Sequence, residues 1–371
     1  MQDWQKLAEV LVGYSTEVRP GELVLVHAPA VAQPLAEEVV RAVVRARAHP
    51  MLRLQPDGDW DDAILLADGD DEQLGWIDPG VWADRERCDV RIVVTADALS
   101  RRNLGDADPA RQAFQERAHM PLYDLQRNRA AEGSLRWCLV EYPTEAAAQD
   151  AGMSFDEYIE FVTHAGFLHL DDPVARWREL RGDIDRVADF LEQVEELRVV
   201  AHETDLRLGV GGRKWVRSYG HRNFPDGETY TGPVEDDVEG TIAFTFPGLY
   251  RGREADGIRL RFERGEVVEA TARSGEDFLR QMIGMDDGAR RVGEFAFGLN
   301  ESVQRFTRNV LYDEKMGGTV HLALGAAYPE TGSQNESALH WDIVCDLRDG
   351  GEVYADGRLV YRAGRFLPDV G

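Results

Sequence analysis

Along residues 1–140, short apolar runs alternate with longer helical segments, and this alternation limits the possible fold more than any other feature of the chain. The runs typical of buried strands are 23–27, 51–54, 90–94 and 135–140, and the helical segments are 3–17, 31–48 and about 107–131. Such an alternation favours a parallel, doubly wound sheet with helices as crossovers. The loop His27-Ala-Pro-Ala-Val-Ala32 after the first strand lacks a glycine fingerprint, so a nicotinamide dinucleotide site is not expected.

The pattern changes in the second half of the chain. Residues 144–196 are helical and charged, with a break at Pro173, and from Leu197 onward short alternating strands are separated by glycine-rich turns. A chain of 371 residues is also long enough for two cores. We therefore expect a doubly wound α/β domain over residues 1–190 and an α+β domain over residues 191–371.

The composition excludes several classes of partner. The formal net charge is −26 and the sequence pI is about 4.7. A chain this acidic repels phosphate groups, so neither nucleic acid nor an anionic membrane surface is an expected partner. Lys6, Lys214 and Lys315 are the only lysines among 42 basic residues. A GC-rich genome explains the preference for arginine, but the size of the negative charge favours a salt-loving organism.

The chain shows no sign of export or membrane insertion. No stretch is long and apolar enough to span a bilayer, and residues 1–20 lack the basic start and apolar run of a signal peptide. Cys88, Cys138 and Cys345 are far apart and have no Cys-x-x-Cys spacing, so we expect reduced, buried thiols. A cytoplasmic protein is the expectation.

Two metal-binding side chains two residues apart mark the clearest candidate site. His340 and Asp342 would project from one face of an extended strand. His321 lies upstream in another strand-like run, Thr319-Val-His-Leu-Ala-Leu-Gly325. Imidazole nitrogen with carboxylate oxygen suits a hydrolytic zinc, cobalt, manganese or iron site. Because a single histidine in a strand is more often a core residue, the interpretation depends on further carboxylates.

Glu228, Glu294 and Glu314 are the acidic candidates. Glu294 lies among apolar residues in Arg291-Val-Gly-Glu-Phe-Ala-Phe-Gly298. Burying an uncompensated carboxylate is costly, so a glutamate in this setting is usually paired or bound to a cation. The residues alone leave open which of these three carboxylates would join the histidines and Asp342 at a metal site.

These segments together resemble the M29 family of metallopeptidases, the thermophilic aminopeptidases. The matching strings stand in the family's order and span roughly residues 220–348. They are Asn223-Phe-Pro-Asp-Gly-Glu-Thr-Tyr-Thr-Gly-Pro233, Val292-Gly-Glu294, Leu311-Tyr-Asp-Glu-Lys-Met-Gly-Gly-Thr-Val-His-Leu-Ala-Leu-Gly-Ala-Ala-Tyr328 and Asn335-Glu-Ser-Ala-Leu-His-Trp-Asp342. Several strings in order are much more specific than any one of them.

The resemblance implies a thermophilic-metalloprotease-like fold and a cytosolic homodimer that removes N-terminal residues from short peptides with broad preference. It also implies two divalent ions per chain, which could be zinc, cobalt, manganese or magnesium. The implied ligands are Glu228, Glu294, His321, His340 and Asp342. Glu314 is left outside this set, because the segment from Glu314 to His321 is about two residues longer than the family pattern.

Glu294 and Tyr328 are the expected catalytic residues. Either Glu294 or Asp342 could bridge two cations, and Glu294 is the first choice for substitution. Tyr328 matches the family's active-site tyrosine, whose phenol could donate a hydrogen bond to the oxyanion of a tetrahedral intermediate. Without the resemblance, Tyr328 is better explained as a packed aromatic residue before Pro329.

Two other functions remain open at this point. Some proteins that resemble this family are ring-cleaving dioxygenases of dihydroxypyridines, and His321, His340 and Asp342 alone could hold one Fe(II). The presence of Glu228 and Glu294 favours the peptidase, because a dinuclear hydrolase needs both. A binding or scaffold protein with a dead site is the third alternative, but no ligand is missing from the sequence.

Overall fold

The computed structural model describes residues 4–58, 60–96, 108–368 and 370, in two compact units that are considered separately. The first unit contains Met1–Val174 and Gly220–Pro225, and the second contains Ala175–Tyr219 and Asp226–Gly371. Residues 3 and 107, at the starts of two predicted helices, lie outside the described residues.

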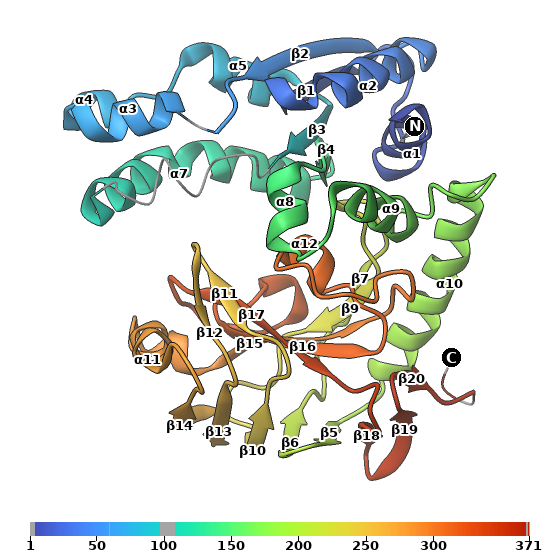
Figure 1. Cartoon of the computed structure of the whole chain (residues 1–371), viewed down its shortest axis with the longest axis vertical. Helices are drawn as coiled ribbons and strands as arrows, with labels where there is room; N and C mark the ends of the chain where they lie inside the picture. Colours follow the sequence, from blue (N-terminus) through green and yellow to red (C-terminus); the bar gives the residue numbers. More distant parts are fainter. Residues whose placement is uncertain (1–3, 59, 97–107, 369, 371) are drawn as a thin grey trace. The chain divides into compact units, whose positions relative to one another are not determined.

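The first unit contains a five-stranded sheet in which all neighbouring strands are parallel (Figure 1). Its strands are β1 (Leu23–Pro29), β2 (His49–Gln55), β3 (Val90–Thr95), β4 (Arg136–Glu141) and β8 (Asn223–Phe224). In the order β2-β1-β3-β4-β8, β2 lies on one side of β1, and β3, β4 and β8 lie on the other. This is the topology of a doubly wound sheet, which confirms the predicted α/β class.

Helices precede the first strand of the first unit and connect or follow the others. They are α1 (Trp4–Val10) with a π-helical turn (Leu11–Ser15), a 3₁₀ turn (Ala30–Ala32), α2 (Gln33–Arg45), α3 (Trp60–Asp68), α4 (Asp71–Leu74), α5 (Pro79–Arg87), α7 (Pro109–Ala131), α8 (Glu145–Asp150) and α9 (Phe155–Ala165). In α2, Leu35, Val39 and Val43 are buried at a four-residue spacing, as expected for a helix packed on a sheet. The sequence pattern misses α3, α4 and α5, because glycine and proline divide that stretch into short helices.

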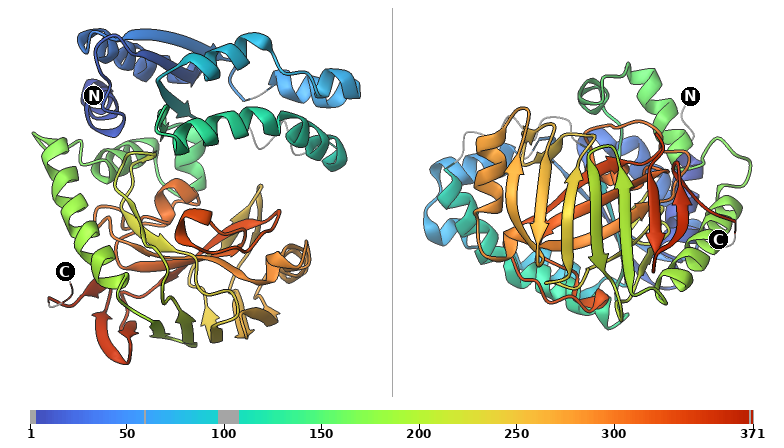
Figure 2. Two further views of the ribbon diagram at one scale, coloured as in Figure 1. Left: turned by 180° about the vertical axis from the view of Figure 1, so that it is seen from behind. Right: turned by 90° about the horizontal axis from the view of Figure 1, so that it is seen from below.

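Helix α10 (Pro173–Leu191) leads into the second unit, and Pro173, predicted as a break, is its first residue. The eight-stranded antiparallel sheet of this unit has the order β14-β13-β10-β6-β5-β18-β19-β20 (Figure 2, right). Its strands are β5 (Glu196–Ala201), β6 (Thr204–Gly209), β10 (Val238–Ala243), β13 (Arg259–Glu263), β14 (Glu266–Thr271), β18 (Glu352–Ala355), β19 (Arg358–Arg362) and β20 (Arg365–Phe366).

A second antiparallel sheet of five strands has the order β17-β16-β15-β9-β7. Its strands are β7 (Val216–Ser218), β9 (Glu228–Thr231), β15 (Val292–Gly298), β16 (Thr319–Gly325) and β17 (His340–Asp346). The remaining elements are the β11–β12 hairpin (Gly248–Tyr250 and Arg253–Ala255), α11 (Glu276–Ile283), α12 (Val310–Asp313) and 3₁₀ turns at Gly288–Arg290 and Pro329–Thr331. The predicted α+β class of this half is confirmed.

One hydrophobic core joins the two sheets of the second unit. Phe295, Leu322 and Ile343 of the five-stranded sheet belong to the same buried cluster as Leu206 and Ile242 of the eight-stranded sheet. Side chains alternate between the two faces of a strand, so the neighbouring residues of β15, β16 and β17 face away from this core. Helix α12 lies over that outer face (Figures 1 and 2).

Within the described part of the chain, no helix combines the length and the hydropathy needed to cross a lipid bilayer.

Candidate metal centre

Five candidate ligands lie in neighbouring strands of the five-stranded sheet. They are Glu228 of β9, Glu294 of β15, His321 of β16, and His340 and Asp342 of β17. Strand alternation explains why they meet: Phe295, Leu322 and Ile343 face the hydrophobic core, and each is flanked by a ligand that faces the other side. The structure thus brings together all five residues that the resemblance implied.

Small residues stand opposite the ligands in the strand register. Ala323 of β16 pairs with both Glu294 and Asp342, and Gly325 pairs with His340. Small side chains between two carboxylates leave their oxygens room to converge over the sheet. The register shifts between Val292 and Glu294, an irregularity that directs a side chain away from the regular pleat.

Glu294 contacts both histidines of the centre. Its Oε1 lies 3.2 Å from Nε2 of His321, and its Oε2 lies 3.5 Å from Nε2 of His340. Nε2 of His340 also lies 3.5 Å from Oδ2 of Asp342. Nδ1 of His340 donates a hydrogen bond of 2.8 Å to the carbonyl oxygen of Ala326, which orients the ring and leaves Nε2 facing the carboxylates.

Glu228 forms a second group with Glu314 and Lys315. The ammonium of Lys315 lies 2.6 Å from Oε1 of Glu228 and 2.7 Å from Oε2 of Glu314. The other oxygen of Glu228, Oε2, lies 3.7 Å from Nε2 of His321. Both groups therefore meet at His321, which is 1% exposed.

The donor atoms fit divalent metal ions. Ligand atoms of Glu294, His321 and Asp342 lie within 4.8 Å of one another, and so do those of Glu228, Glu314 and His321. Among the described residues, Oε2 of Glu228 and Oδ1 of Asp342 are buried and find no hydrogen-bond partner. Buried carboxylate oxygens without partners are costly, and a cation would satisfy both. Carboxylate and imidazole donors are those of hydrolytic zinc, cobalt and manganese sites.

The pKa values of these carboxylates and imidazoles depend on burial and on the charges of their neighbours. Burial opposes the charge on Glu294, but its interactions with His321 and His340 hold its pKa well below the ordinary value. Burial likewise opposes charge on the two histidines, yet the carboxylates raise the pKa of His321 to about 9 and that of His340 to about 10. Burial raises the pKa of Asp342, and Glu314 raises it further.

Tyr328 lies at the edge of the centre, between the end of β16 and the 3₁₀ turn Pro329–Thr331. Its ring centroid is 5.1 Å from that of His340 and 5.3 Å from that of Tyr230. Tyr328 is 40% exposed, but the desolvation that its phenol does undergo and the charge of Glu294 both raise its pKa, so its hydroxyl keeps its proton at neutral pH. Tyr328 can therefore donate a hydrogen bond from beside the ligands.

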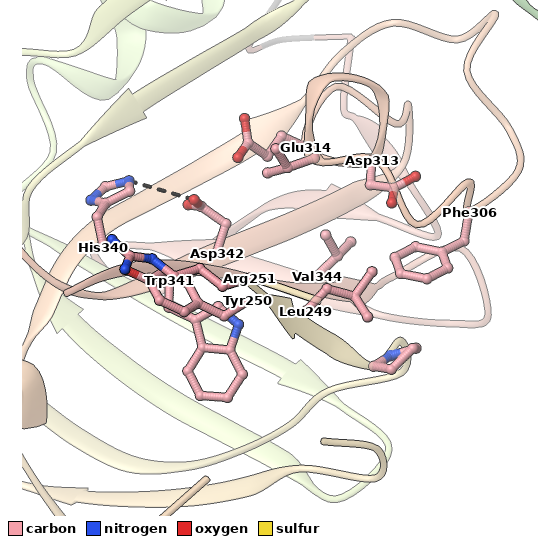
Figure 3. Close-up of a pocket in the computed structure, with 12 residues that line it drawn as sticks. Leu249, Tyr250, Arg251, Phe306, Asp313, Glu314, His340, Trp341, Asp342 and Val344 are labelled. Atoms are coloured by element: carbon pink, nitrogen blue, oxygen red, sulfur yellow. Dashed lines mark ion pairs between the residues drawn. The ribbon is translucent and has the colours of Figure 1, made fainter. Parts of the chain in front are cut away.

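A cavity of about 300 Å³ adjoins the centre. His340 and Asp342 stand at one end of it, and Phe306 and Asp313 stand at the other (Figure 3). The apolar lining includes Leu249 of the β11–β12 hairpin, Phe306, Trp341 and Val344. The ligands thus face a cavity with room for an apolar side chain, although Arg251 and Asp313 also line it.

Lys315 and this cavity are absent from the sequence predictions. The signal for Lys315 was available: it is one of three lysines and directly follows Glu314 in a segment that matched the family. The cavity had no local signal, because its walls come from the β11–β12 hairpin, from the loop before α12 and from β17.

Comparisons with known proteins agree with this geometry. The sequence model of the family described as "Thermophilic metalloprotease (M29)" matches residues 1–366. Aminopeptidase 2 of Geobacillus stearothermophilus is 28% identical, with 99% of each chain covered. Aminopeptidase T of Thermus thermophilus is 25% identical, with 98% of each chain covered. A solved structure, wild-type AmpT from Thermus thermophilus, has a TM-score of 0.84 at 24% identity and covers 98% of each chain, which confirms the fold.

Proposed function

Because this chain belongs to the M29 family of thermophilic metalloproteases, we propose that it is a metal-dependent aminopeptidase that removes N-terminal residues from short peptides. The observation that carries the proposal is the convergence of Glu228, Glu294, His321, His340 and Asp342 on one sheet face beside an apolar cavity. Both full-length relatives are named as aminopeptidases, which supports the same activity here.

The ligand set supports two divalent ions when the centre is fully loaded. His340, Asp342 and Glu294 would hold one ion, and Glu228 with Glu314 would hold the other, with His321 between them. Bound divalent ions would supply a Lewis acid for the peptide carbonyl and lower the pKa of an attacking water. Glu294 contacts both histidines through its two oxygens, and this position suits a bridging carboxylate.

Tyr328 would stabilise the negative charge that develops on the peptide carbonyl oxygen. Its phenol keeps its proton because burial and nearby carboxylates raise its pKa. A fixed donor beside the ligands acts mainly in the transition state, when the oxygen is most negative.

The cavity would accept the side chain of the N-terminal residue. Its polar end is formed by the ligands His340 and Asp342, so a substrate with its scissile bond at the ligands would direct its first side chain towards Phe306 and Val344. The far end also includes the carboxyl group of Asp313, which accepts hydrogen bonds from Thr307. The apolar side chains around it favour acceptance of apolar residues.

The dioxygenase alternative receives no support from the comparisons. A mononuclear Fe(II) site needs two histidines and one carboxylate, which would leave the buried Glu228 and the doubly engaged Glu294 without a function.

Metal analysis combined with an amide hydrolysis assay tests the proposal. Protein stripped with a chelator should be inactive on Leu-p-nitroanilide and should regain activity when zinc, cobalt or manganese is added back. The iron content should be negligible. One tightly bound iron per chain and no amide hydrolysis under any metal would contradict the proposed function and support the dioxygenase.

A further inference from the structure

Lys315 is a buried cation inside the candidate metal centre. It follows α12 in the segment that leads into β16, and it is 1% exposed. Its ammonium contacts Oε1 of Glu228 at 2.6 Å and Oε2 of Glu314 at 2.7 Å. A fully buried lysine is rare unless carboxylates compensate its charge, and here two do.

The contacts of Lys315 coincide with one half of the centre. Glu228 and Glu314, together with His321, form one of the two ligand triads. In the other triad, the ion pairs that Glu294 and Asp342 make with described residues are all with histidines and none is with lysine or arginine. The two halves therefore differ, because among the described residues a lysine ammonium pairs with the carboxylates of only one of them.

We propose that the ammonium of Lys315 is a resident cation in the half of the centre formed by Glu228 and Glu314. The centre would then bind one divalent ion tightly at Glu294, His340 and Asp342. A second ion would bind at Glu228 and Glu314 only by displacing the ammonium. The inference rests on the proposed function, because it concerns the same metal centre.

Electrostatics supports unequal affinities. A divalent ion on Glu228 and Glu314 would compete with the ammonium for the same oxygens and would be repelled by it at close range. Two carboxylates at 2.6 and 2.7 Å from the ammonium stabilise the charged form of Lys315. Moving a buried ammonium away from both partners is costly, so the second ion should bind on the order of a hundredfold more weakly than the first.

A zinc or cobalt titration of the full chain tests this inference. Isothermal calorimetry, with metal content after equilibrium dialysis, would be compared for wild type, Lys315→Met, Lys315→Arg and Lys214→Met. Wild type should show one tight and one weak ion, and Lys315→Arg should retain that asymmetry. Lys315→Met should bind two ions with dissociation constants within about tenfold of each other, because the competing charge is removed. Lys214 is exposed, so Lys214→Met controls for the loss of one positive charge and should behave as wild type.

The outcomes separate this inference from the proposed function. Two ions of equal affinity in wild type, or an unchanged isotherm in Lys315→Met, would overturn the role of Lys315 while leaving the peptidase intact. Absence of any tight ion, or of amide hydrolysis, would instead contradict the proposed function. If Lys315→Met does not fold, the wild-type isotherm decides alone, because two equal affinities overturn the inference without any variant.

Discussion

The carboxylate of Glu294 in β15 lies 3.2 Å from Nε2 of His321 in the neighbouring strand β16. The second oxygen of the same carboxylate lies 3.5 Å from Nε2 of His340. The carboxylate of Glu294 therefore contacts the imidazoles of both His321 and His340. Because Glu294 is only 4% exposed, its charge depends on these partners or on a bound cation.

Replacing Glu294 by glutamine should abolish function while leaving the fold intact. The amide keeps the shape of the side chain but removes the charge that a divalent ion and the two histidines require. We expect kcat/KM on Leu-p-nitroanilide to fall by at least about a thousandfold, with loss of the tight ion. Glu336→Gln, at an exposed position before β17, is the matched control and should retain activity. Near-normal hydrolysis by Glu294→Gln would exclude Glu294 as a catalytic ligand.

Metal affinity should rise with pH across the neutral range. The pKa values of about 9 for His321 and about 10 for His340 mean that both rings are protonated at pH 7 when no metal is bound. A metal ion binds only the deprotonated nitrogen, so binding releases these protons, and low pH opposes it. Each displaced proton adds up to about a tenfold gain in affinity per pH unit below these pKa values. Calorimetry in buffers of different ionisation enthalpy would count the protons, and an affinity independent of pH between 6 and 9 would contradict the prediction.

Local sequence pattern was sufficient to predict the ligands of β17, because His340 and Asp342 are two residues apart in one strand. The convergence of Glu294 with His321 depends on which strands are neighbours and on a register that sets Ala323 opposite Glu294, and neither follows from periodicity. The resemblance to a family supplied that information instead. The resemblance assigned no role to Lys315, and the position of this side chain depends on the turn between α12 and β16.

The fold shows the same division between local and long-range information. The alternation of strands and helices predicted the parallel sheet of the first unit. It could not predict β8, because Asn223–Phe224 is only two residues long and pairs with β4 from a distant part of the sequence. Short edge strands of this kind depend on tertiary contacts more than on β propensity.

Replacing Tyr328 by phenylalanine should lower kcat more than it changes KM. The substitution removes a hydroxyl that acts when charge develops on the carbonyl oxygen, while the ring contact with His340 remains. We expect kcat to fall by about a hundredfold with unchanged metal content. Tyr354→Phe in β18 of the other sheet serves as the control, since the hydroxyl of Tyr354 donates its hydrogen bond to Glu352 and not to a metal ligand. An unchanged kcat would show that the hydroxyl of Tyr328 has no role in catalysis.

Enlarging Val344 should narrow the choice of N-terminal residue. Val344 lines the apolar end of the cavity and stands two residues after Asp342 in β17. In Val344→Phe the larger ring would occupy part of the space of about 300 Å³. We expect hydrolysis of Leu-p-nitroanilide to fall by about ten- to a hundredfold relative to Ala-p-nitroanilide. The measurement is the ratio of kcat/KM for the two substrates within one preparation. An unchanged ratio would show that the side chain of the substrate's N-terminal residue does not bind beside Val344.

Salt should stabilise the protein. With 68 acidic and 42 basic residues, repulsion among carboxylates outweighs attraction when averaged over the chain. Raising the ionic strength from 0.1 M to 1 M shortens the screening length from about 10 Å to about 3 Å. This change weakens surface ion pairs such as Arg198–Asp205 as well, but the excess of negative charge leaves a net gain. We expect Tm to rise by roughly 5 °C or more in potassium chloride. Calorimetric scans at matched pH would measure the shift. A falling Tm would show that the ion pairs dominate, and it would remove the physical reason for proposing a salt-loving source.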